Sequence, residues 1–210
     1  WTKVNRLENG NTDVSTANLT GVEKELAEIA VSLGVDEADF AACLDSQEAK
    51  DRVDNEAGMG NSSGVSGTPG NFLIDTQDNY AVFVPGAFPY DILDSVISTM
   101  TGDGRDALES EIASAGEEDA LSALTVVELE DIAGLNENDF VRGDQNSRIY
   151  LVEYSDYDCP FCGRFHVTAQ RLVNEGKVAW VYRQLPLPQL HPDAKTKSAA
   201  AICAPFGPNS

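Results

Sequence analysis

The sequence predicts an α/β domain with a mixed central sheet and an added helical subdomain. Two nearly continuous apolar runs, residues 148–154 and 178–183, have the pattern of buried parallel strands. The helical run between them completes a β–α–β unit. Two further strand-like runs, 71–75 and 80–84, are separated by turn residues, which predicts a β-hairpin. Apolar residues at helical spacing over 21–58 predict the helices of the subdomain.

Charge and hydropathy exclude several classes of partner. The chain of 210 residues carries 35 acidic and 14 basic residues, a formal net charge of −21. Such a surface repels nucleic acid and anionic lipid, so we expect neither as a partner. No apolar run of the sequence approaches the ~18 residues that a membrane-spanning helix needs. Because the sequence begins at Trp1, we expect a processed chain from which any export signal has been removed.

The four cysteines form two groups. Cys159 and Cys162 have the C-x-x-C spacing of a redox centre or of half a zinc site. Cys43 and Cys203 lie far apart in the sequence, and a structural disulfide between them would indicate an oxidising compartment.

The sequence around Cys159 favours thiol–disulfide exchange. The attacking species in exchange is a thiolate, and a helix N-terminus lowers a thiol pKa through its unpaired N–H groups. Cys159 is expected where a helix begins, because Pro160 suits the first helical position. Cys162 lies one turn further along, where it can attack a mixed disulfide at Cys159 and release the substrate.

Two other interpretations of the C-x-x-C pair remain. A zinc site would need two more ligands from Cys43, Cys203, His166 and His191, and these residues form no second ligand pair of the usual spacing. The pair could also be an inert structural bridge. We expect neither a metal nor a cofactor.

Two segments resemble one known family. VEYSDYDCPFCGRFH, residues 152–166, is similar to the active-site segment of DsbA-like thiol oxidoreductases, and GVSGTPGNFLI, residues 64–74, is similar to their cis-proline segment. The resemblance covers about 21–100 and 138–204, and it implies a thioredoxin-like fold with an inserted helical subdomain. In that fold Cys159 would be the nucleophile, Cys162 the resolving thiol, Pro69 a cis-proline beside the sulfurs and Thr68 a backbone partner for the substrate peptide.

The resemblance also suggests roles for residues around these thiols. Glu153 would be a buried proton acceptor for Cys162, and the alternative is a strand-end carboxylate that faces water. His166 would either tune the thiols electrostatically or pack within its helix. His191, in a proline-rich loop, is expected at the surface. Phe161 and Val65 are expected to be exposed and to form a groove for unfolded chains.

The resemblance divides the chain into five segments. Residues 1–63 and 191–210 would be parts of the helical subdomain, 64–100 the cis-proline half of the fold, 146–190 the C-x-x-C half, and 101–145 an acidic, partly helical linker. Relatives of this kind can carry a second, structural disulfide in the helical subdomain, which implies a bond between Cys43 and Cys203; two free buried thiols are the alternative.

The order of the two halves departs from the family pattern. The cis-proline half precedes the C-x-x-C half here, so the fold is expected to be circularly permuted within one molecule. The chain could instead span parts of two domains of a tandem array. In a third arrangement, two chains would exchange halves in a dimer.

The expected function is that of an extracytoplasmic (periplasmic, cell-envelope or secreted) enzyme, a DsbA-like protein disulfide oxidoreductase. It would form disulfides in unfolded or partly folded exported proteins through Cys159 and Cys162, and a membrane or soluble redox partner would recycle it. The alternatives are a disulfide reductase or isomerase of the same fold, and a non-catalytic thioredoxin-like domain that binds proteins.

Overall fold

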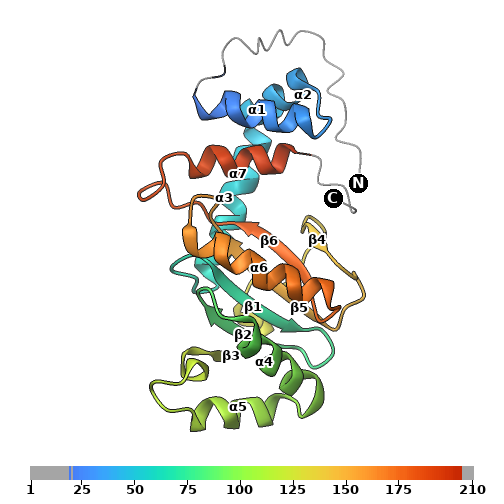
Figure 1. The fold of residues 1–210 in the computed structure, drawn as a ribbon, viewed down its shortest axis with the longest axis vertical. Coiled ribbons are helices and arrows are strands. Elements are labelled where there is room, and N and C mark those ends of the chain that lie inside the picture. The colour runs from blue at the N-terminus through green and yellow to red at the C-terminus, as the bar shows by residue number, and fades with distance from the viewer. Residues whose placement is uncertain (1–18, 20, 205–210) are drawn as a thin grey trace.

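The computed structural model describes Leu19 and residues 21–204, so predictions for 1–18, 20 and 205–210 lie outside the described residues. The described chain begins with helices, and strands and helices then follow in mixed order (Figure 1). In chain order they are α1 (Val22–Ser32), α2 (Glu37–Asp45), α3 (Gln47–Ser62), β1 (Gly70–Asp75), β2 (Tyr80–Pro85), α4 (Tyr90–Gly102), α5 (Arg105–Ser114), the 3₁₀ turn η2 (Ala120–Ala123), β3 (Thr125–Glu128), the 3₁₀ turn η3 (Leu129–Asp131), β4 (Val141–Arg142), β5 (Ile149–Ser155), α6 (Pro160–Asn174), β6 (Ala179–Gln184) and α7 (Ala194–Cys203).

The strands of the described region form one mixed sheet in the order β3-β2-β1-β5-β6-β4. Strands β5 and β6 run parallel, as the β–α–β unit requires, and every other neighbouring pair runs antiparallel. β1 lies directly beside β5 although more than seventy residues separate them, which joins the two halves of the fold in one sheet. The predicted hairpin and β–α–β unit are both confirmed.

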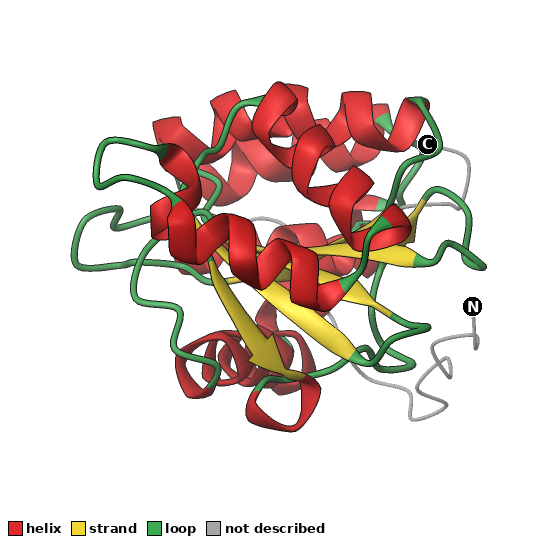
Figure 2. Cartoon of the chain, turned by 90° about the horizontal axis from the view of Figure 1, so that it is seen from below, coloured by secondary structure: helices red, strands yellow, loops and turns green. Residues whose placement is uncertain are grey.

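Successive side chains of the central strands point to opposite faces of the sheet, so the buried core has two parts, one on each face. Leu73 and Leu151 point to the face that α4 and α6 cover, where they pack with Phe165. Phe72 and Val152, their neighbours in the sequence, point to the opposite face, over which the end of α3 lies. Figure 2 shows helices on both sides of the sheet. Central strands that are buried on both faces read as continuous apolar runs, which explains the pattern in the sequence.

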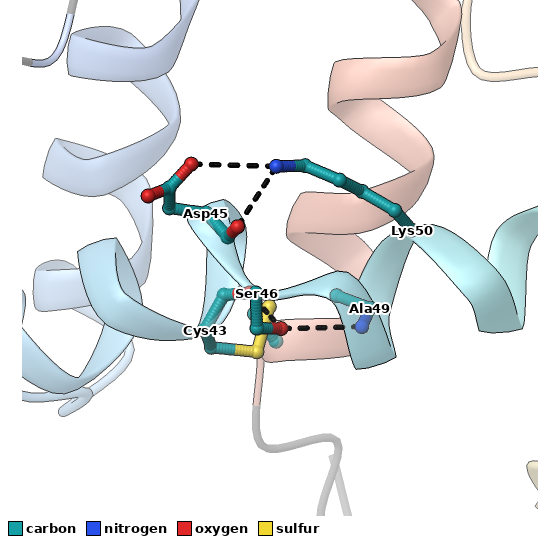
Figure 3. Close-up of a disulfide and its surroundings, with 6 residues drawn as sticks. Cys43, Asp45, Ser46, Ala49 and Lys50 are labelled. Carbon is teal, nitrogen blue, oxygen red and sulfur yellow. Dashed lines mark hydrogen bonds and ion pairs between the residues drawn. A yellow bond between two sulfur atoms is a disulfide. The ribbon is translucent and has the colours of Figure 1, made fainter.

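Helices α1, α2 and α7 gather at one end of the molecule with the first part of α3 (Figure 1). Phe40, Val53 and Ala199 are among the buried residues that they share. A disulfide bond between Cys43 and Cys203, the bond that the resemblance implies, fastens α2 to the end of α7 (Figure 3). No helix within the described residues is long and apolar enough to cross a membrane.

Residues 101–145, expected to be a partly helical linker, also complete the sheet. β3 pairs with β2 and β4 pairs with β6, so this segment supplies both edge strands. The strands were missed because runs of four and two residues are too short to show a period of two in the sequence. The segment is fixed further by the buried guanidinium of Arg183, which donates to Asp139 Oδ2 at 2.8 Å and to the backbone oxygens of Ala133 and Gly134.

Candidate active site

Cys159 lies at the N-cap of α6, directly after the turn that follows β5. Pro160 occupies the first turn of the helix, where a residue without an N–H leaves no donor unused. The backbone N–H of Gly163 donates to the carbonyl of Cys159 at 3.2 Å and begins the helical hydrogen-bond ladder. The sequence therefore places Cys159 at the positive end of α6, as predicted, with Cys162 one turn inside the helix.

The loop before β1 brings a second segment to the same sulfur. The Thr68–Pro69 peptide bond is cis, and the Cys159 thiol donates to the backbone oxygen of Thr68 at 3.3 Å. Gly70 follows without room for a side chain, since a Cβ there would lie 2.3 Å from Val65 Cγ1. Val65 is therefore buried under the loop, and the expectation that it lines an exposed groove was wrong.

Both sulfurs are free thiols, and their environments shift their pKa values in opposite directions. Burial opposes ionisation of Cys159, but hydrogen bonds from the Thr68 side chain, from Cys162 and from the backbone N–H of Phe161 outweigh it, so the pKa of Cys159 is lowered. Burial raises the pKa of Cys162 to about 12. Cys159 therefore ionises more readily than an ordinary cysteine, and Cys162 is kept protonated.

Asp156 anchors the turn that carries Cys159, a role that the sequence did not suggest. Its buried carboxylate accepts from the backbone N–H groups of Asp158 and Leu187, both at 2.8 Å, and lies 3.0 Å from Nδ1 of His191. His191 was expected at the surface, but the Asp156 contact holds it partly buried. The Asp-x-Asp pattern before the first cysteine was the available signal, because Asp side chains accept from backbone N–H groups two residues on.

Glu153 is completely buried on the face of the sheet that α6 covers. Its Oε2 accepts from the indole N–H of Trp180 at 3.0 Å, and its Oε1 lies 3.1 Å from Nε2 of His166. The alternative of a carboxylate that faces water is therefore wrong. His166 also lies edge-on against the rings of Trp180 and Tyr182. Sequence reasoning named Glu153 and His166 separately, and the structure brings them together.

Apolar and aromatic surface remains open beside the thiols. The Phe161 side chain, between the two cysteines, is 54% exposed. Tyr157, two residues before Cys159, is also exposed and packs against Tyr182 with ring centroids 5.3 Å apart. Phe161 and Tyr157 therefore leave exposed aromatic surface next to the C-x-x-C pair.

The residues considered as zinc ligands have other partners in the described structure. Cys43 and Cys203 are bonded to each other, so neither thiol is available to the C-x-x-C pair. His166 and His191 contact Glu153 and Asp156, respectively. Within the described residues no group of three or more His, Cys, Asp and Glu side chains could hold a metal ion.

Two family models match the two halves of the chain. A model described as a DSBA-like thioredoxin domain matches residues 15–98, and a thioredoxin model matches residues 135–209. With the mixed sheet and its covering helices, these matches establish a thioredoxin-like fold and confirm the resemblance to DsbA-like proteins. Circular permutation stays a prediction.

Curated relatives match shorter stretches. The chain is 38% identical over 69 residues to Na(+)/H(+) antiporter NhaA 3 of Salinispora tropica and 35% identical over 69 residues to Na(+)/H(+) antiporter NhaA 1 of Salinispora arenicola, covering 32% of this chain and 11% of each antiporter. It is 36% identical over 55 residues to a putative protein-disulfide oxidoreductase of Rickettsia bellii, covering 24% of this chain and 21% of that protein. The chain thus spans about a tenth of the antiporters that it matches.

Proposed function

We propose that this thioredoxin-like chain is a thiol–disulfide oxidoreductase that forms disulfides in exported proteins, with Cys159 as the nucleophile and Cys162 as the resolving thiol. The match to a DSBA-like thioredoxin domain and the similarity to a putative protein-disulfide oxidoreductase support the general activity. The observation that carries the assignment of residues is the pair of free thiols at the start of α6, beside Thr68 and Pro69.

The geometry supports a direct exchange mechanism. In the oxidised enzyme, a substrate thiolate would attack the sulfur of Cys159, and the bond between Cys159 and Cys162 would break as the new mixed disulfide forms. A second substrate thiolate would then attack the substrate sulfur of the mixed disulfide and release Cys159 as a thiolate. Groups that lower the pKa of Cys159 stabilise this leaving group, which favours an oxidant.

The backbone carbonyl of Thr68 would accept a hydrogen bond from the substrate as well as from Cys159. This carbonyl accepts from the Cys159 thiol when that thiol is protonated, and it becomes available to a substrate N–H once the sulfur has reacted. Pro69 has no N–H, so the loop presents an acceptor and an apolar ring beside the sulfur. Exposed Phe161 would contact apolar side chains of an unfolded substrate protein.

We place the protein in an extracytoplasmic compartment, where a soluble or membrane-bound redox partner would reoxidise it. The support is the disulfide between Cys43 and Cys203, because such bonds persist in oxidising environments. The match to a DSBA-like domain agrees with this compartment.

The decisive experiment is a pH titration of thiolate absorbance combined with equilibration in glutathione buffers. We expect a thiolate midpoint below that of free cysteine and a more oxidising potential than a reductase would have. The Cys159→Ser variant should lose the low midpoint. The Cys162→Ser variant should accumulate a mixed disulfide with glutathione, formed when its Cys159 thiolate attacks oxidised glutathione and releases one glutathione thiolate. A reducing potential would indicate a reductase or isomerase, and absence of exchange would leave a protein-binding domain.

A further inference from the structure

The proposed exchange reaction requires a proton to move at a buried sulfur. When a substrate thiolate attacks Cys159, Cys162 leaves as a thiolate and must gain a proton; when Cys162 attacks a mixed disulfide, it must lose that proton. The sulfur cannot exchange protons freely with bulk water, because Cys162 is only 1% exposed. Burial also raises the pKa of Cys162 to about 12, so its thiolate is a costly species in this position.

Glu153 contacts His166, which follows Cys162 by one helical turn on α6, but Glu153 is itself buried away from water. It lies on β5, on the face that α6 covers, and its side chain is 0% exposed. The groups that face it come from three directions: His166 from α6, Trp180 and Tyr182 from β6, and the uncharged Asn71, which pairs with it in register on β1. The indole of Trp180 is a permanent donor that does not titrate.

His166 is the group in this set that reaches both Glu153 and solvent. Its Nε2 lies 3.1 Å from Glu153 Oε1, while 35% of its side chain is exposed. His166 follows Cys162 by four residues on α6, so the two side chains lie on the same face, about 6 Å apart along the helix axis. Imidazole is the side chain whose ordinary pKa lies nearest neutral pH, which suits it to pass a proton in either direction.

We propose that His166 connects the buried Glu153 carboxylate to solvent and thereby sets the rate of every step in which Cys162 gains or loses its proton. The inference rests on the proposed exchange function and extends it. During attack by Cys162, the thiol proton passes to Glu153, the sulfur bonds to Cys159, and the substrate leaves as a thiolate. The proton then leaves through His166 to water. During attack on the oxidised enzyme, the same proton enters by the reverse path. His166 does not touch the reacting sulfurs in this scheme, and it affects Cys162 only through Glu153.

The test isolates the step that Cys162 performs. The reduced protein reacts with the chromogenic disulfide dithiobis(nitrobenzoate): Cys159 displaces the first nitrothiobenzoate, and Cys162 displaces the second in a unimolecular phase. In His166→Ala we expect the second phase to slow by about 10²-fold, the scale of a lost acid–base group, with the first phase unchanged. Added imidazole should restore the second phase, because the deleted ring was partly exposed. His166→Gln keeps a hydrogen-bonding side chain that cannot take up and release a proton as an imidazole does. This variant should be slow and should not respond to imidazole.

The controls separate the outcomes. Val167→Ala, a change at a neighbouring position of α6 that is 74% exposed, should leave both phases at the wild-type rate. Equal second phases in His166→Ala and the wild type would overturn the proposal. So would a slow phase that imidazole does not restore and that accompanies a lower unfolding midpoint in both His166 variants, because that result describes a packing role. If the wild type releases no nitrothiobenzoate at all, the exchange function itself fails.

Discussion

Replacing both Cys43 and Cys203 by alanine should lower the free energy of unfolding by several kcal/mol while the reactivity of Cys159 is retained. The bond joins residues 160 positions apart, so it closes almost the whole described chain into one loop. Removing it raises the conformational entropy of the unfolded chain. The loop-closure relation puts this entropy gain at about 17 cal/mol/K, which corresponds to about 5 kcal/mol of stability at room temperature. Measured losses for native disulfides fall between about 2 and 5 kcal/mol.

Equilibrium urea denaturation of the oxidised wild type and the double variant measures this difference. The denaturant slope should also rise in the variant, because the unfolded chain without the cross-link exposes more surface. The bond joins α2 to α7 (Figure 3), in the helical end of the molecule that lies beyond the sheet (Figure 1), so alkylation of Cys159 should proceed at the wild-type rate in the folded variant.

A matched control removes the other two cysteines. Cys159 and Cys162 are free thiols in this structure, and a disulfide between them in the oxidised protein would close only a short loop, so replacing both by alanine should change the denaturant slope little. A loss in the Cys43 and Cys203 double variant no larger than in this control would refute the loop-closure argument. It would mean that the bond constrains the unfolded chain little, or that the folded state is strained by it.

Two further predictions concern pH and assembly. Burial opposes ionisation of Asp75, but hydrogen bonds from Arg148 and two backbone N–H groups outweigh it and lower the pKa of this carboxyl. The stability from this lowered pKa is present above the ordinary carboxyl pKa and lost as pH falls through the folded-state value. Asp75→Asn should therefore be less stable than the wild type at neutral pH, with the gap in urea midpoints closing in acid; a constant gap would contradict the assignment. Because β1 and β5 pair within one chain, refolding Cys159→Ser together with Pro69→Ala should restore no exchange activity, whereas recovery would indicate halves exchanged between chains.

Several parts of the fold and site could be predicted from local sequence. Residues 148–154 and 178–183 reveal buried strands because their apolar character is continuous, and the hairpin is marked by its turn residues. Cys159 could be placed at a helix start because Pro160 is favoured there. These features depend on neighbours a few positions apart, and the sequence contains those neighbours in full.

Tertiary structure decided the contacts between distant segments. The contact of Cys159 with Thr68 spans 91 residues and exists because β1 lies beside β5. The pairing of Glu153 with His166 depends on how α6 lies across the sheet, and the burial of His191 depends on the loop that reaches Asp156. The sequence by itself determined which residues could react and where the long central strands and the helix after Cys159 lie. The packing of the sheet determined how far each thiol is buried and which carboxylate is excluded from water, because burial and hydrogen-bond partners are set by segments far away in the chain.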